Sequence, residues 1–179
     1  YHLGQALYPL GRYREALDAL RRAADEKHAA EDLGFMLGLL NAKLDQNAQA
    51  ETEFKRAIAT SPESMLASIH HQLGLLYKRQ QKPELALQEF QEARSLEPAN
   101  LEHRFQKAVC LATLGELEAV EDDLKRILEE YPDFVECHVE LGRFYQQKDE
   151  IDLAIEEFQR ALDLDPTQPD QQETIGKAY

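Results

Sequence analysis

The chain has 179 residues, and its 20 Lys and Arg stand against 34 Asp and Glu, which gives a formal net charge of −14. Proteins bind nucleic acids and anionic membrane surfaces through clusters of Lys and Arg, so a strongly negative net charge argues against a general binder of either kind. With 43% hydrophobic and 30% charged residues, the composition is that of a chain that folds around a buried core rather than a disordered one.

Apolar residues recur with helical spacing along the whole chain, which predicts a succession of helix pairs. The expected pairs are residues 1–10 with 13–26, 30–44 with 48–60, 65–80 with 83–96, 101–114 with 117–130 and 134–148 with 151–164, followed by a half-pair from Pro169. Pro83 and Pro169 are expected in the first turns of their helices, where the missing N–H costs nothing. No segment has the pattern of a strand. The sequence therefore predicts an all-α protein.

The predicted pairs follow a repeat of 34 residues. A small residue recurs in each first helix, at Gly4, Gly38, Gly74, Ala108, Gly142 and Gly176, with two extra residues near Met65 and Leu66. From the second of these glycines, Ala50, Phe54, Ala57 and Pro62 follow at fixed spacings. Similar residues follow Gly74, Ala108 and Gly142, whereas the series after Gly4 ends on His28 instead of proline. A fixed period of this length indicates a repeat architecture in which each unit packs on its neighbours.

This pattern resembles the tetratricopeptide repeat, whose signature has a Leu-Gly pair and a Tyr in the first helix, then A-x-x-x-F, then Pro. The residues that match its first helix are Leu73, Gly74 and Tyr77, then Leu141, Gly142 and Tyr145, and finally Ile175, Gly176 and Tyr179. The chain has no Trp, and histidine takes the family's Trp position at His70 and His138. The resemblance implies a right-handed superhelical solenoid of antiparallel helix pairs.

On this resemblance, residues 1–179 are expected to form a single array. Its parts are a partial first repeat at 1–30, then repeats at 31–66, 67–100, 101–134 and 135–168, and the start of a sixth at 169–179. Because the array begins and ends inside a first helix, we interpret the sequence as an excerpt of a longer protein.

No motif in the sequence assembles a catalytic site. The chain contains no G-x-S-x-G, no G-x-x-x-x-G-K-[ST], no H-E-x-x-H and no C-x-x-C. Imidazole and thiol groups recur near the starts of successive first helices, at His70, His71, His103, Cys137 and His138. Such groups hold zinc or copper where they converge, but ordinary helix packing is the favoured interpretation. We therefore expect no enzymatic activity, no metal and no cofactor.

Two features of the sequence bear on location. The longest apolar run, at residues 33–40, is far shorter than the roughly 20 residues that cross a bilayer, so no membrane insertion is expected. The two cysteines, Cys110 and Cys137, are too few for a disulfide scaffold and favour a reducing, cytoplasmic compartment.

In the family, the first helices line a concave groove that typically binds a peptide. Positions around each Leu-Gly pair project onto that face, and they are Phe35, Leu39, Lys43, His71, Leu75, Lys78, Arg79, Phe105, Val109, Val139 and Arg143. The apolar members form a stripe edged by cations, which suits an amphipathic helix or extended segment that carries acidic residues.

Within that set, the expected anchors are Phe35, Leu75 and Phe105, and the cations expected to set the register are Lys78, Arg79 and Arg143. The alternative for any single apolar member is that it packs between repeats and never meets a ligand. The resulting prediction is a non-catalytic scaffold that binds a protein or peptide partner in its groove.

Two other functions stay open at this point. The chain is a candidate for self-association into a homo-oligomer, because the terminal helices have no partner helix beyond them and the last half-helix carries Ile175 and Tyr179. It is also a candidate for a targeting or regulatory module of a larger enzyme.

Charge is unevenly distributed along the chain. Residues 101–168 carry 18 acidic and 7 basic side chains, a net charge of −11, mostly in second helices and turns. A solvated convex face is the favoured interpretation of this acidity. The alternative is that a basic partner docks on it, since a field of one sign steers encounters.

Overall fold

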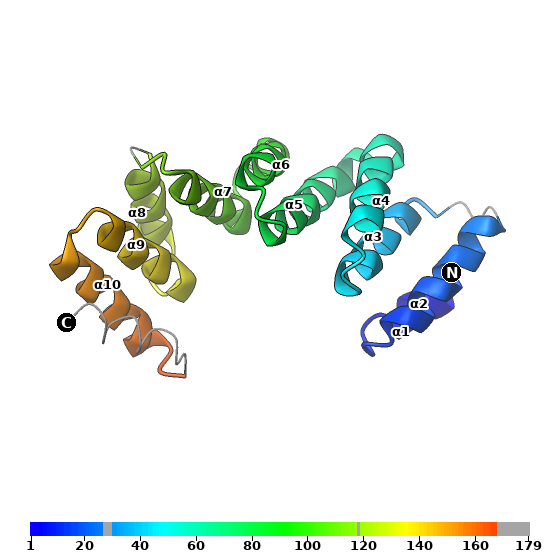
Figure 1. Ribbon diagram of the computed structural model, residues 1–179, viewed down its shortest axis with the longest axis horizontal. Coiled ribbons are helices and arrows are strands. Elements are labelled where there is room, and N and C mark those ends of the chain that lie inside the picture. The colour runs from blue at the N-terminus through cyan, green and yellow to red at the C-terminus, as the bar shows by residue number, and fades with distance from the viewer. Residues whose placement is uncertain (27–29, 118, 168–179) are drawn as a thin grey trace. The chain divides into compact units, whose positions relative to one another are not determined.

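In the computed structural model, residues 1–26, 30–117 and 119–167 are described, and they form ten α-helices without a strand (Figure 1). The helices are α1 (His2–Leu7), α2 (Tyr13–Asp25), α3 (Leu33–Lys43), α4 (Asn47–Thr60), α5 (Glu63–Arg79), α6 (Pro83–Leu96), α7 (Leu101–Leu114), α8 (Val120–Glu130), α9 (Val135–Gln147) and α10 (Ile151–Leu164). The five predicted pairs are all present, which confirms the all-α fold. The half-pair expected at 169–179 lies outside the described residues.

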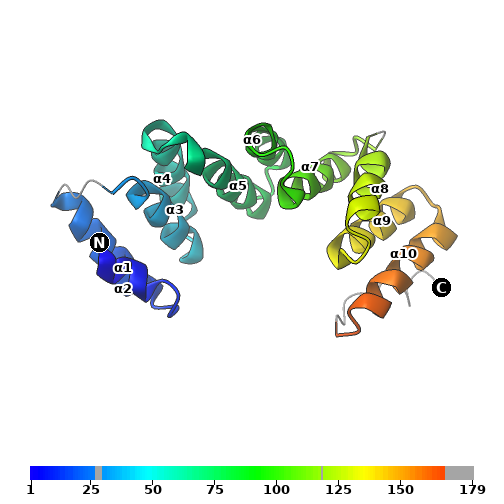
Figure 2. The same ribbon diagram turned by 180° about the vertical axis from the view of Figure 1, so that it is seen from behind.

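The chain divides into two compact units, Tyr1–Pro98 with α1 to α6 and Ala99–Tyr179 with α7 to α10. Within each unit the two helices of a pair pack on each other, and α1 beside α2 and α9 beside α10 can be followed in both views (Figures 1 and 2). Each second helix also contacts the next first helix of its unit, as α4 does with α5. First helices of neighbouring repeats touch as well, α3 with α5 and α7 with α9.

Small residues let the two helices of a pair approach closely. A Cβ added to Gly38 would lie 2.5 Å from the ring of Phe54, and one on Gly142 would lie 2.6 Å from the ring of Phe158. Both rings are fully buried. The recurring glycine and the large apolar residue sixteen positions later are therefore two sides of one contact.

The turn inside each pair passes through the left-handed region of backbone conformation. The residues with positive φ are Gly11, Asp45, Gln81, Gly115 and Asp149, and they recur with the period of the repeat. The N–H of the following residue bonds back to a carbonyl of the preceding helix, as Lys82 does to the carbonyl of Tyr77 at 3.0 Å. This is the bond of a Schellman motif, which satisfies the last carbonyls of the helix. The first predicted helix accordingly ends at Leu7 rather than at residue 10.

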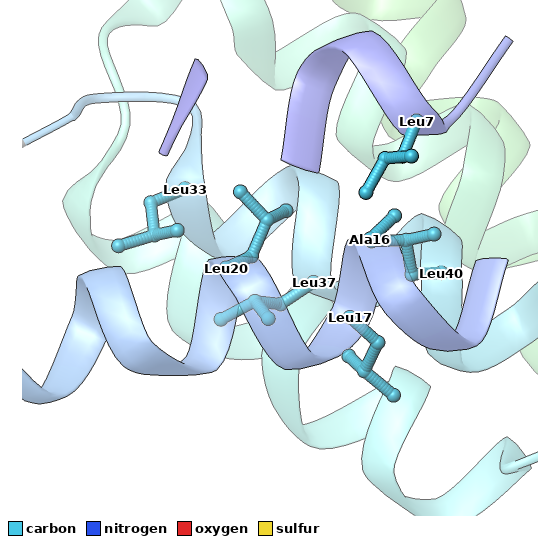
Figure 3. Packing of buried hydrophobic residues seen from close by; sticks show 7 residues of the cluster. All are labelled: Leu7, Ala16, Leu17, Leu20, Leu33, Leu37 and Leu40. Carbon is cyan, nitrogen blue, oxygen red and sulfur yellow. The ribbon is translucent and has the colours of Figure 1, made fainter. Parts of the chain in front are cut away.

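A leucine-rich core joins α1, α2 and α3. Its buried members are Leu7, Ala16, Leu17, Leu20, Leu33, Leu37 and Leu40, and Figure 3 shows their side chains gathered between the three helices. These positions fall at helical spacing on one face of each helix, as amphipathic packing requires. None of the helices in the described residues is long and apolar enough to span a membrane.

Candidate functional site

A cavity of about 400 Å³ opens between the first helices of two neighbouring repeats, α3 and α5, within the first unit. Its lining residues are Leu39, Ala42 and Lys43 from α3 and Gln72, Leu75, Leu76, Lys78 and Arg79 from α5. Residues three or four apart share one face of a helix, which brings Leu39 and Lys43 together on α3 and Leu75, Lys78 and Arg79 together on α5. The structure therefore gathers five of the eleven predicted peptide-binding residues in one cavity.

Arg79 joins the end of α5 to the end of α3. Its guanidinium donates to the backbone carbonyl of Ala42 at 3.0 Å and to Asn47 Oδ1 at 3.2 Å, and it lies 3.9 Å from a carboxylate oxygen of Asp45. A cation at the C-terminus of α3 also complements the partial negative charge there. About half of the Arg79 side chain stays exposed, so it holds the wall of the cavity and still offers charge to solvent.

Lys43 differs from Arg79 in that its charge has no partner among the described residues. It is exposed at the end of α3, and no ion pair or hydrogen bond joins its ammonium to any other residue in the described part of the chain. The apolar side chains beside it, Leu39 and Leu75, are only half-buried. The cavity thus combines apolar walls that remain partly open with a cationic edge, in a chain whose net charge is strongly negative.

Two other predicted residues of the first unit are occupied inside their own helix pairs. The ring of Phe35 lies 6.1 Å from that of Phe54, and the His71 ring makes an edge contact with Phe90 at 5.5 Å between centroids. Both side chains are half-buried, and neither lines the cavity between α3 and α5.

In the second unit, Phe105 and Val109 lie in the interior rather than on an open face. They are 6% and 7% exposed, and the Phe105 ring packs edge-on against Phe134 at 4.9 Å between centroids. Repeat spacing places a residue on a helix face but does not say which neighbour covers it. Their burial leaves little side-chain surface for a ligand, which favours the alternative that Phe105 and Val109 pack between helices, and the role of Phe105 as an anchor stays a prediction.

The remaining predicted residues of that unit lie on α9. Val139 is half-buried, and Arg143 is exposed with its guanidinium 2.6 Å from Glu140 on the same helix. These residues belong to the second unit, and Leu39, Lys43 and Leu75 belong to the first. A groove that contains residues of both units therefore stays a prediction.

The histidines serve structure in a way that the spacing did not reveal. His138 Nδ1 lies 2.7 Å from a Glu157 oxygen and its Nε2 lies 2.9 Å from the carbonyl of Pro132, while His70 Nδ1 lies 2.7 Å from Glu89. Each pair joins a first helix to the second helix of the same repeat. The sequence feature that could have predicted these contacts is a glutamate directly before the buried Phe of the second helix, Glu89 before Phe90 and Glu157 before Phe158. Among the described residues, no group of three or more His, Cys, Asp or Glu is placed to hold a metal ion.

Cys137 is a buried structural thiol. Its Sγ donates to the carbonyl of Leu124 at 3.5 Å, and burial, with Glu157 and Glu140 nearby, raises its pKa to about 12. A thiol with that pKa is protonated at neutral pH, and the thiolate is the reactive form. Cys137 is thus buried and protonated, whereas reactive cysteines are accessible and have a lowered pKa.

A polar network ties α4 to α5, and a network of the same residue types ties α8 to α9. Tyr77 and Lys55 both donate to one Glu51 oxygen, at 3.0 and 2.7 Å. Tyr145 and Lys125 do the same to Glu121, at 3.1 and 2.7 Å. The lysine contacts lower the pKa of both glutamates, and burial raises the pKa of both tyrosines.

Comparison with curated proteins gives relatives that are far longer than this chain. Human protein O-mannosyl-transferase TMTC1 is 33% identical over 133 residues, covering 74% of this chain and 15% of that protein. Anaphase-promoting complex subunit 3 of Schizosaccharomyces pombe (strain 972) is 27% identical over 154 residues, covering 86% of this chain and 23% of that protein. The chain spans less than a quarter of the length of either relative.

Family models and solved structures agree on the fold. One tetratricopeptide repeat model matches residues 1–65 and 71–133, and a second matches residues 135–168. The crystal structure of YrrB, a TPR protein with an unusual peptide-binding site, matches with a TM-score of 0.79 at 22% identity over 97% of this chain and 88% of that one. The predicted solenoid of helix pairs is thus confirmed, and the chain belongs to the tetratricopeptide repeat family, whose members commonly mediate protein–protein interactions.

Proposed function

We propose that the chain is a non-catalytic scaffold, and that the cavity between α3 and α5 binds an amphipathic segment of a protein partner that carries apolar and acidic side chains. The observation that carries this proposal is that Leu39 and Leu75 form an apolar wall in the same cavity that Lys43 and Arg79 edge with positive charge. The occupant is a helix or an extended segment that buries its apolar face against the leucines.

The apolar contacts and the charged contacts contribute differently to binding. Burying the open parts of Leu39 and Leu75 supplies affinity, at about 25 cal/mol per Å² of apolar surface removed from water. The charges contribute register and discrimination more than affinity, since exposed ion pairs give about 0.2–1 kcal/mol each. A cavity of about 400 Å³ falls within the range of about 300–1,000 Å³ that is usual for ligand sites, which is enough room for anchoring side chains.

The comparisons support binding of a protein partner without identifying it. YrrB is a TPR protein with a peptide-binding site, and anaphase-promoting complex subunit 3 is by its name part of an assembly. Neither name gives the partner of this chain, so the partner is defined here only by its chemistry.

A displayed library of random peptides, each long enough for roughly four helical turns, tests the proposal directly. Selection on the wild-type chain is expected to enrich peptides with apolar residues three or four apart and with Asp or Glu. The same selection on Leu75→Asp is expected to lose that enrichment, while Leu85→Asp, which changes an exposed leucine of α6 outside the cavity, is expected to keep it. Equal enrichment on Leu75→Asp and wild type would remove the cavity as the binding site.

Charge reversal at Lys43 tests the acidic component of the ligand. Lys43→Glu replaces an attraction with a repulsion, so an enriched acidic peptide is expected to bind roughly five- to tenfold more weakly. Arg94→Glu on α6 makes the same change of net charge outside the cavity, and it is expected to change the Kd less than about twofold. Equal weakening by the two variants would mean that overall charge, and not this cavity, attracts the peptide.

A further inference from the structure

A cavity larger than the one between α3 and α5 lies in the second unit and is not part of the α3–α5 site. It has a volume of about 550 Å³ and is lined by α8, α10 and the first half of α9. Two second helices and the first helix between them enclose it, whereas two first helices enclose the α3–α5 cavity. This cavity therefore lies on the second-helix side of its repeats, whereas the α3–α5 cavity lies on the first-helix side.

Apolar side chains form the wall of this cavity. Leu128 of α8 is half-buried, Leu141 of α9 is buried, and Leu164 at the end of α10 keeps 40% of its surface exposed. Pro132, in the turn before α9, is also exposed and lies in the wall. An apolar side chain from a partner would cover Leu128 and Leu164 and remove their remaining surface from water.

The buried polar side chains that line the cavity, His138 and Glu157, already contact each other. His138 engages Glu157 with one ring nitrogen and the carbonyl of Pro132 with the other. Because both ring nitrogens are engaged, this pair offers no open donor to an anion and no free imidazole to a metal ion. Recognition at this site must come from the apolar wall and from the charges around it.

Those charges leave an unbalanced negative edge. The two cations of the lining are paired, Lys125 with Glu121 at 2.7 Å and Arg160 with Glu156 at 2.6 Å. By contrast, Glu129 and Asp163 line the cavity without an ion pair or hydrogen bond to any other described residue. The segment 101–168 around them has a net charge of −11, which attracts a positively charged partner from a distance.

We propose that the cavity between α8 and α10 docks a basic protein segment, which inserts an apolar side chain against Leu128 and Leu164 and pairs a Lys or Arg with Glu129 or Asp163. This surface is independent of the α3–α5 site and has the opposite charge preference. The scaffold would then hold two chemically distinct partner segments, an acidic amphipathic one on α3 and α5 and a basic one on α8 and α10.

The probe for this site is a fluorescein-labelled peptide in which pairs of leucines alternate with pairs of lysines over roughly three helical turns. Its counterpart has glutamate in place of lysine. Fluorescence anisotropy with the Leu75→Asp variant of the full chain, in which the α3–α5 site is disabled, is expected to show saturable binding of the lysine peptide and none of the glutamate peptide. Failure of the lysine peptide to bind the full chain would overturn the proposal.

Matched variants separate a site from general attraction. The double variant Glu129→Lys with Asp163→Lys is expected to weaken binding of the lysine peptide at least about tenfold. The double variant Glu116→Lys with Glu136→Lys makes the same change of net charge in the same unit at exposed positions outside the lining. It is expected to weaken binding less than about threefold. Equal losses in the two double variants would mean diffuse electrostatic binding and would overturn the site.

Two further variants test the apolar contact and the independence of the two sites. Leu164→Asn, at an exposed position, removes the apolar contact without changing the charge and is expected to abolish binding of the lysine peptide, and unchanged binding would contradict an apolar anchor. Leu75→Asp in the first unit is expected to leave binding of the lysine peptide unchanged. The two proposals can therefore fail separately, because each depends on a different peptide and a different variant.

Discussion

His138 and Glu157 are two ionisable side chains that lie buried in contact with each other between α9 and α10. They are 5% and 9% exposed, and their contact is 2.7 Å. Burying polar groups is costly unless they are hydrogen-bonded, and here the carbonyl of Pro132 lies 2.9 Å from the second ring nitrogen of His138. The pair therefore fixes α10 against α9 only while both members are present.

Removing one member is expected to cost more than removing both. Glu157→Leu leaves the His138 ring without its partner and is expected to lower the free energy of unfolding by about 2–4 kcal/mol. The double variant His138→Phe with Glu157→Leu fills the same space with apolar groups and is expected to recover most of that loss. Denaturant unfolding followed by circular dichroism measures both changes. A single variant no worse than the exposed Glu156→Leu would contradict this account.

The Cys137 thiol is expected to be inert in the folded protein. Its pKa is raised to about 12 by burial, so at pH 8 it is a thiol, while the unfolded chain has an ordinary pKa and reacts. Mass spectrometry after iodoacetamide treatment should show Cys137 unmodified without denaturant and alkylated with it. Rapid alkylation under native conditions would contradict its burial.

The same shift has a consequence for stability in alkali. The folded-state pKa of Cys137 lies above its unfolded value, so its contribution to stability is complete below about pH 9 and is lost as the pH rises toward about 12. The raised pKa values of Tyr77 and Tyr145 act with the same sign.

At the scale of the helix, α3 contains a matched pair of glycines. A Cβ at Gly38 would sit 2.5 Å from the Phe54 ring, while one at Gly34 would meet Ala57 Cβ at an ordinary 3.4 Å. Gly38→Ala is therefore expected to overpack the contact and destabilise by about 1–3 kcal/mol. Gly34→Ala is expected to be neutral or to stabilise by up to about 1 kcal/mol through helix propensity. Thermal unfolding of the two variants compares them, and similar melting temperatures would contradict the close-approach explanation.

Helix pairs are the level at which sequence reasoning succeeded most fully. The spacing of Gly38 and Phe54 reflects the close contact of the two helices of a pair, and Pro62 marks the start of the next helix, so the pattern predicts the pair and its approximate ends. The burial of Phe105 and the existence of the cavity beside Leu164 could not be predicted, because both depend on side chains that come together from several helices. The shared face of Lys43, Leu75 and Arg79 could be predicted because helical spacing sets it on two neighbouring first helices, while their role in peptide binding stays a prediction.

At the scale of the whole chain, the same side-chain contacts between helices occur in both units. The Glu51, Lys55 and Tyr77 network of the first unit recurs as Glu121, Lys125 and Tyr145 in the second, and the contact of His70 with Glu89 recurs as His138 with Glu157. The repetition means that each unit carries its own connections between neighbouring helices. In repeat proteins, stability is approximately a sum of such local terms.

The first unit is accordingly expected to fold by itself. Residues 1–98 contain α1 to α6, the leucine core and the α3–α5 cavity. Expressed alone, they are expected to keep the helical circular dichroism of the intact chain per residue and to unfold cooperatively, at a lower temperature because fewer repeats contribute. A fragment that is unfolded at 25 °C would show that the units depend on each other.

The measurement that tests the central claim most directly is a titration of the strongest acidic peptide from the selection against wild type, Leu75→Asp and Leu85→Asp, followed by fluorescence anisotropy. We predict that Leu75→Asp raises the Kd at least about thirtyfold, roughly the cost of placing a charge against an apolar ligand face, while Leu85→Asp stays within about twofold of wild type. Equal affinities for the three proteins would contradict the assignment of peptide binding to the cavity between α3 and α5.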